Sequence, residues 1–139
     1  MAWWGYALIS AFAAAMTAIL AKVGTQGVPS NLATAIRTLV VLVLSVGIVL
    51  STREYQSLPA LKARSLVFLG LSGVATGISW LAYFRALQLA PASRVAPIDK
   101  LSLGLTILFA ALFLGEQVPW QVAVGSALII CGALLTLLA

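Results

Sequence analysis

The sequence predicts an all-α integral membrane protein, a bundle of five transmembrane helices that forms one domain over residues 1–139. Of the 139 residues, 63% are hydrophobic and 8% are charged, and the mean hydropathy is +1.13. The apolar residues fall into five runs, each close to the roughly 20 residues that a helix needs to cross a bilayer. Every run is continuously apolar, whereas a strand of a membrane barrel would alternate apolar and polar residues.

The first two runs cover about residues 3–21 and 31–51. The first run begins with three aromatic residues, which are typical anchors at a membrane surface. It is longer than the apolar core of a secretory signal peptide, so we interpret it as a retained span. Residues 24–31 contain two glycines and a proline and predict a turn, with Ser30 or Asn31 as the N-cap of the second helix.

The other three runs cover about residues 65–84, 95–114 and 119–138. Span 3 follows the longest polar connector, residues 52–64, and a tight joint at residues 85–94 makes spans 3 and 4 antiparallel neighbours. These boundaries complete the five-span prediction.

Three prolines mark expected helix starts. Pro59 predicts a short interfacial helix within the connector before span 3. Pro91 lies at or near the start of span 4, and Pro119 suits the first turn of span 5. The first turn of a helix leaves its N–H groups without partners in the helix, so the missing N–H of proline costs nothing there.

Small residues occur at helical spacing on several spans and predict close helix packing, since small side chains let helix backbones approach each other in lipid. The packing lies either inside one bundle or between two copies, and span 5 is our first choice for a contact between copies. The residues are Gly70, Gly73 and Gly77 on span 3, Ala11, Ala14, Ala15 and Ala18 on span 1, and Gly125 and Gly132 on span 5.

Loop charges give no firm orientation. The cations on the side of the N-terminus are Arg53, Lys62 and Arg64, and those on the side of the C-terminus are Lys22, Arg85 and Arg94. Arg37 and Lys100 in the first turns of spans 2 and 4 change the tally to three against five. Either the chain has one orientation with a cytoplasmic C-terminus, or it inserts both ways up. Because five is odd, a second copy must be inverted to build an inverted-repeat architecture.

Three charged residues lie inside the predicted spans. Arg37 and Asp99 each sit roughly 8 to 10 Å along their helices, so they can form an ion pair at similar depth. Lys100 follows Asp99 directly, and we expect no pair between these two because their side chains point about 100° apart. Alternatively, Arg37 and Lys100 extend to the headgroups. Asp99 is too short for that, which favours a role in a polar cavity or gate.

Trp80 and Tyr83 share one face of span 3 and are either interfacial aromatics or cavity lining. The chain has no His and one Cys, Cys131 in span 5, so we expect no metal site, no disulfide and no cofactor. The cations are scattered singly at the ends of apolar runs. This placement favours membrane lipids, and not nucleic acid, as partners.

The same inventory disfavours an enzyme, because intramembrane catalysis needs a positioned nucleophile and base or a metal. Two functions stay open. One is transport of a small molecule, and the other is a non-transporting membrane scaffold or a subunit of a larger transporter or lipid-linked flippase complex.

Residues 83–135 resemble the EamA-type repeat of the drug/metabolite transporter superfamily. The residues that carry the resemblance are Ala90-Pro91-Ala92-Ser93, Ala96-Pro97, Leu114-Gly115-Glu116 and the glycines of span 5, joined by Ala35-Ile36-Arg37 and Tyr83-Arg85-Ala86-Leu87. The Asp99-Lys100 pair is similar to the variant in single-repeat bacterial and archaeal members. The resemblance implies that this chain is half of a ten-span export fold, whose two inverted halves enclose a central cavity.

These observations together predict a secondary transporter that exports small metabolites or organic ions by alternating access from the bacterial inner membrane. We expect it to act as a homodimer, antiparallel and of dual topology, in contact with a small-molecule substrate. The expected cavity or gate residues are Arg37, Trp80, Tyr83, Asp99 and Lys100. Asp99 would serve proton coupling or a cationic substrate, Arg37 and Lys100 gating pairs or anion attraction, and the two aromatics apolar walls.

Overall fold

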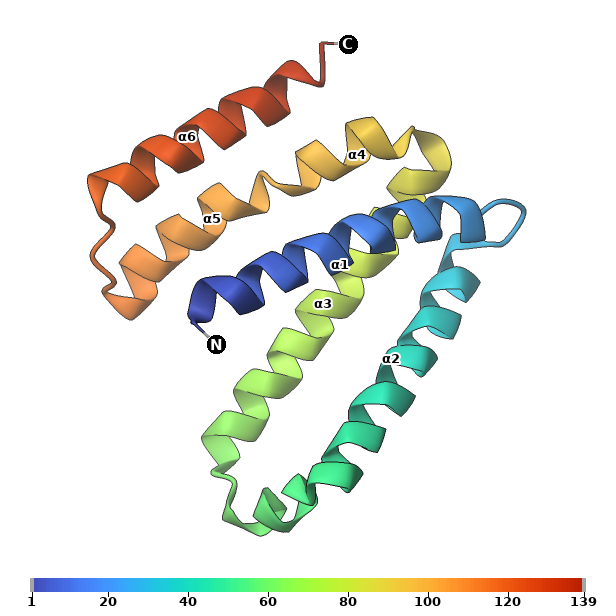
Figure 1. Cartoon of the computed structure of the whole chain (residues 1–139), viewed down its shortest axis with the longest axis vertical. Helices are drawn as coiled ribbons and strands as arrows, with labels where there is room; N and C mark the ends of the chain where they lie inside the picture. The colour runs from blue at the N-terminus through green and yellow to red at the C-terminus, as the bar shows by residue number, and fades with distance from the viewer. Residues whose placement is uncertain (1, 139) are drawn as a thin grey trace. The chain divides into compact units, whose positions relative to one another are not determined.

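The computed structural model describes residues 2–138, in which helices alternate with short connectors and no strand occurs (Figure 1). The elements are α1 (Trp3–Gly24), α2 (Ser30–Thr52), the 3-10 helix η1 (Glu54–Ala60), α3 (Ala63–Leu89), α4 (Ala92–Asp99), α5 (Ser102–Phe109), the π-helical turn η2 (Ala110–Leu114) and α6 (Trp120–Leu135). The all-helical prediction is confirmed over these residues.

Four helical segments are long and apolar enough to cross a membrane: α1, α2, α3 and the combined segment Ala92–Leu114. The fifth predicted span contains α6, which has 16 residues and is about 24 Å long, against a hydrocarbon core of about 30 Å. Backbone hydrogen bonds from residues 136, 137 and 138 to residues three positions earlier extend the ordered chain beyond α6. The fifth span therefore stays a prediction.

The N-caps differ from the expected ones in two places. Pro29, with φ −54° and ψ 135°, is the N-cap of α2, so Ser30 and Asn31 already lie in the helix. Pro119 is likewise the residue before α6 and is not in its first turn. In both cases the pyrrolidine ring fixes the φ angle with which the chain enters the helix. Pro91, the N-cap of α4, lies where the sequence placed it.

The chain divides into two compact units. The hairpin unit, residues 21–88, contains α2 and α3, which run antiparallel on either side of η1 (Figure 1). Arg53 ends α2 in the left-handed conformation, with φ 59°. Pro59 lies near the end of η1, so it does not start that short helix.

The broken-helix unit comprises residues 1–20 and 89–139. Here α4 and α5 follow each other along α6, which runs back beside them (Figure 1). The approach is closest at Gly104, where an added Cβ would lie 2.6 Å from Cδ1 of Ile130. Gly115, with φ 68°, ends η2 and turns the chain toward α6, a conformation that glycine adopts without steric cost.

The predicted glycine faces have no close neighbour. A Cβ added at Gly70, Gly73 or Gly77 on α3 would meet nothing within 4 Å, and the same holds for Gly125 and Gly132 on α6. Inside the broken-helix unit, tight packing thus uses Gly104, and any close approach at the other five glycines must come from outside their own unit.

Candidate functional site

Three predicted site residues are grouped in the hairpin unit with a fourth residue, Phe84. The guanidinium carbon of Arg37 on α2 lies 4.0 Å from the ring centre of Trp80 and 5.4 Å from that of Phe84 on α3. Tyr83 meets the Phe84 ring edge to face, with 6.5 Å between centroids. Aromatic faces attract a cation at such distances through the ring quadrupole. We refer to these four residues as the arginine–aromatic cluster.

The antiparallel arrangement of α2 and α3 explains why the cluster forms. Arg37 is seven residues after Ser30, hence about 10 Å from the start of α2. Trp80 and Phe84 are nine and five residues before the end of α3 at Leu89, hence about 13 Å and 8 Å from it. Their spacing of four residues places both rings on one face of α3. The two rings and the arginine therefore lie at similar distances from the same end of the helix pair.

The polar edge of Arg37 is unoccupied by protein. Within the hairpin unit, residues 21–88, no hydrogen bond or ion pair involves its guanidinium, although the side chain is half-buried. The rings cover a face of the group, while its five N–H donors lie in the plane of the group. The expected ion pair with Asp99 stays a prediction, because Asp99 belongs to the other unit.

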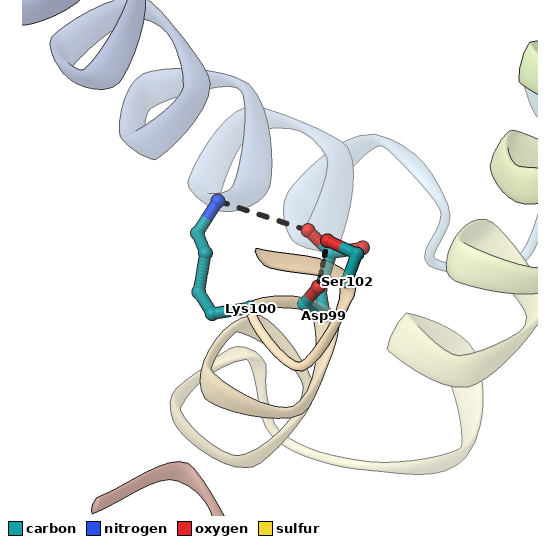
Figure 2. A network of polar contacts seen from close by, with 3 residues as sticks. All are labelled: Asp99, Lys100 and Ser102. Carbon is teal, nitrogen blue, oxygen red and sulfur yellow. Dashed lines mark hydrogen bonds and ion pairs between the residues drawn. The ribbon is translucent and has the colours of Figure 1, made fainter. Parts of the chain in front are cut away.

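Asp99 and Lys100 lie where α4 ends and α5 has not yet begun (Figure 2). Lys100 Nζ is 3.7 Å from Asp99 Oδ2, so the expectation that these neighbours do not pair is wrong. The lysine side chain is long enough to fold back over the turn between the helices. The prediction considered only the angle between consecutive residues of a regular helix and not this flexibility. Both side chains are accessible, with 43% of Asp99 and 59% of Lys100 exposed.

The break between α4 and α5 has a local cause. Pro97 lies inside α4 and has no N–H to donate to the carbonyl four residues earlier, which weakens the helix around it. The amides of Lys100 and Leu101 bond to carbonyls three residues back, and the Ser102 hydroxyl donates to the Asp99 carbonyl at 2.7 Å (Figure 2). The predicted fourth span, residues 95–114, lies within Ala92–Leu114, which is long and apolar enough to cross a membrane as one segment. The prediction did not include the tightened turn after Pro97, although the proline was its signal.

A polar contact that the sequence did not reveal ties the last turn of α3 to the loop before α2. Gln88 Nε2 donates to the carbonyls of Val28 at 2.6 Å and Thr25 at 3.3 Å, and its Oε1 accepts from Arg85 at 3.2 Å. A glutamine inside a mostly apolar stretch was the only signal for this contact.

An open pocket of about 380 Å³ adjoins the same contact. Lys22 Nζ donates to the carbonyl of Leu87, where the last turn of α3 leaves carbonyls without a partner in the helix. The pocket is lined by Lys22, Thr25, Gln26, Gly27, Val28, Pro29, Leu87 and Gln88. It lies one helical turn along α3 from Phe84, on the side of the helix end.

No group of three or more His, Cys, Asp or Glu side chains capable of holding a metal occurs among the described residues. Cys131, on α6, is a free and exposed thiol. The chemistry that this arrangement offers is therefore that of a cation over aromatic rings in one unit and of an accessible carboxylate at a helix break in the other.

Residues 1–138 match the EamA-like transporter family. The chain belongs to this family. This EamA-like protein is also 50% identical over 133 residues to an "Uncharacterized transporter in cobO 3'region" from Sinorhizobium sp, an alignment that covers 96% of the chain and 94% of the relative. No solved structure matches it.

The family and this relative confirm the resemblance inferred from the motifs. The EamA-like chain is a multi-pass membrane protein and a transporter. Its membership points to transport and not to an enzyme.

Proposed function

We propose that the chain is a secondary transporter that exports small metabolites or organic ions by alternating access across the bacterial inner membrane. Residues 1–139 act as one five-span domain, and two copies that face opposite ways form the working homodimer. Family membership supports transport, and the broken fourth span supports the mechanism.

The break at Asp99 is the observation that carries the proposal. Transporters built from inverted repeats place substrate and coupling ions at discontinuous helices, whose interrupted backbone lines a cavity. An ionisable residue within a span typically faces such a cavity. Asp99 lies where the helix tightens: Lys100 and Leu101 keep helical angles, but their amides bond three residues back instead of four. Its carboxylate is accessible. We assign it the coupling proton, with the turn between α4 and α5 as the hinge.

Two features support the antiparallel homodimer. The loops carry three cations on each predicted side, and Arg37 and Lys100 change the tally only to three against five, so the charges give no firm orientation. The relative from Sinorhizobium aligns over 94% of its own length, so a second transporter-named protein has about the length of this chain. A pair of such repeats reaches the inverted architecture only if one copy is turned over.

Flux through vesicles that contain only this chain tests the transport proposal. The purified protein is reconstituted into proteoliposomes with an imposed pH gradient, and labelled amino acids, monocarboxylates and lipophilic cations are offered one at a time. We expect at least one of them to move faster than through empty vesicles, and the gradient to drive it. Folded protein in tight vesicles that carries none of them would replace the proposal with the scaffold or subunit function.

Cys131 offers a test of the dimer orientation. Cys131 lies about one helical turn beyond the midpoint of α6. Two antiparallel α6 helices that cross at their midpoints would place it opposite Val124 of the partner copy, which lies one turn before the midpoint. Val124→Cys in the native background should then give a disulfide-linked dimer, whereas Cys131 alone should not. A disulfide through Cys131 alone would indicate parallel α6 helices, because Cα atoms more than about 7 Å apart are not bridged.

A further inference from the structure

Arg37 is the least balanced charge in the hairpin unit. An arginine inside a span is costly to remove from water, and contact with aromatic rings offsets only part of that cost. Its side chain is half-buried, and none of its N–H groups has a hydrogen-bond acceptor within the hairpin unit, residues 21–88. The group thus keeps its donors available for an acceptor from outside the hairpin unit.

The hairpin unit itself offers no acid as partner. Residues 21–88 contain six Lys or Arg and one acid, Glu54. Glu54 follows the far end of α2, 17 residues after Arg37, which corresponds to about 25 Å of helix. Asp99 of the other unit already lies 3.7 Å from Lys100. The excess of cations favours an anionic ligand.

The direction of the side chain argues against simple extension toward the headgroups. Trp80 lies about 13 Å from the end of α3 and Phe84 about 8 Å from it. The guanidinium is nearer to the Trp80 ring, at 4.0 Å, than to the Phe84 ring, at 5.4 Å. Arg37 thus reaches the ring that is farther from the helix ends.

Geometry and charge then select the anion. A guanidinium binds a planar carboxylate through two parallel N–H···O bonds. One arginine neutralises a monoanion, whereas a doubly charged phosphate would leave excess charge in a poorly hydrated place. The indole of Trp80 and the ring of Tyr83 beside Phe84 provide apolar surface for the rest of the molecule.

We propose that the arginine–aromatic cluster is the binding site for an organic monocarboxylate, with Arg37 holding the carboxylate and Trp80 and Tyr83 covering its apolar part. The assignment of monocarboxylates as the transported substrate rests on the proposed function. The assignment of the cluster as a carboxylate-binding site does not depend on transport and can be tested without it.

Ligand binding to the chain in nanodiscs of zwitterionic lipid tests the site without requiring flux. The probes are straight-chain and aromatic monocarboxylates, each paired with its uncharged amide, and inorganic phosphate is included. We expect at least one carboxylate to bind at least 100-fold more tightly than its amide. Equal binding of acid and amide, or a preference for phosphate, would overturn the assignment.

Substitutions identify the arginine. Arg37→Gln should abolish carboxylate binding, and Arg37→Lys should weaken it about tenfold or more, because lysine keeps the charge but loses the planar fork. Arg64→Gln is the matched control, since Arg64 also lies over a ring, 5.7 Å from that of Phe68, but at the start of α3. Should Arg37→Gln fail to fold, Arg37→Lys decides alone. Unchanged binding in Arg37→Lys, or an equal loss in Arg64→Gln, would contradict the proposal.

A lipid headgroup is the competing source of an anion. Native mass spectrometry of protein extracted from membranes would then show an anionic lipid retained by the wild type and lost from Arg37→Gln, together with no carboxylate binding, and this result overturns the inference. Carboxylate binding without flux would instead leave the site in place and remove the proposed function. Flux of cations without carboxylate binding would remove the proposed site and leave the proposed transport function in place.

Discussion

The two units handle a charge inside an apolar helix in opposite ways. In the hairpin unit, Arg37 lies seven residues into an unbroken helix and rests on aromatic rings without an ionic partner. In the broken-helix unit, Asp99 lies seven residues after the first residue of α4, at the point where the helix stops, and pairs with the adjacent lysine. The same depth along a helix therefore gives two different environments.

The difference follows from side-chain length and backbone continuity. Arginine is long enough to reach across to a neighbouring helix, so α2 keeps all its backbone hydrogen bonds and the cation is stabilised by the rings. Aspartate is short, and its carboxylate stays close to its own backbone. The turn at Lys100 and Leu101 exposes it. This contrast suggests a division of labour, with anion binding in the hairpin unit and proton coupling at the break.

The largest expected effect is that of Asp99→Asn. If the carboxylate carries the coupling proton, this substitution should lower gradient-driven flux at least about 100-fold, or about 2.7 kcal/mol in the barrier, while passive exchange of substrate continues. The thermal unfolding midpoint should hardly move, because the carboxylate is 43% exposed. Proteoliposome flux with and without a pH gradient measures both.

Lys100→Met is the control for Asp99→Asn, because it removes the ion pair and leaves the carboxylate in place. An exposed pair at 3.7 Å contributes little to stability, so we expect the unfolding midpoint to stay close to that of the wild type and coupled flux to fall much less than in Asp99→Asn. Comparable losses in both variants would assign the effect to the ion pair, and the contrast between the two units would then lose its functional meaning.

The next largest effect should come from Gly104→Leu in the broken-helix unit. Its Cβ would lie 2.6 Å from Cδ1 of Ile130, and the larger side chain would force α5 away from α6, at a cost of about 1 to 3 kcal/mol. Gly104→Ala should cost less, because the end of the isoleucine can rotate and alanine favours the helix. Denaturation midpoints in nanodiscs provide the measurement.

Gly125→Leu on α6 is the matched control, since nothing lies within 4 Å of a Cβ at that position. It should change stability by less than about 0.5 kcal/mol within one copy. If Gly125→Leu instead dissociated a dimer, the result would support α6 as the contact between copies. Equal destabilisation by Gly104→Leu and Gly125→Leu in a monomer would contradict the packing of this unit.

How far the sequence predicted the molecule depended on the range of the interaction. Continuous apolar runs predicted the helices and the membrane, because these follow from local composition. The exact ends of the helices were harder to predict. Pro29 and Pro119 precede their helices, because a proline that fixes φ fits equally well just before a helix and in its first turn. The break at Lys100 was missed although Pro97 indicated it, because hydropathy does not distinguish a continuous span from an interrupted one.

The candidate site shows the same limit. Sequence reasoning selected Arg37, Trp80 and Tyr83 separately, and for the arginine it considered an ion pair with Asp99 or extension to the headgroups, not contact with the rings. Contact with Trp80 depends on the relative height of two antiparallel helices and not on any local pattern. The bonds from Gln88 to Thr25 and Val28 span 60 or more positions and left no motif.

The smallest of the expected effects tests whether these long-range bonds stabilise the hairpin unit. Gln88→Leu removes both donations to the loop carbonyls of Thr25 and Val28. Because Thr25 and Val28 line an open pocket where water can bond to these carbonyls, we expect a cost of about 1 kcal/mol. The loss is local, so hydrogen exchange of the loop amides of residues 25–28 should accelerate about tenfold while the global unfolding midpoint moves little.

Gln26→Leu is the matched control, because Gln26 lines the same pocket while only its backbone forms a hydrogen bond, to Val23. We expect no change in exchange for this variant. Binding at Arg37 should fall less than threefold in Gln88→Leu, since the rings of Trp80 and Phe84 lie one to two turns farther along α3. A loss as large as that of Arg37→Lys would instead mean that the loop contact sets the height at which the two helices meet, and that the arginine–aromatic cluster depends on it.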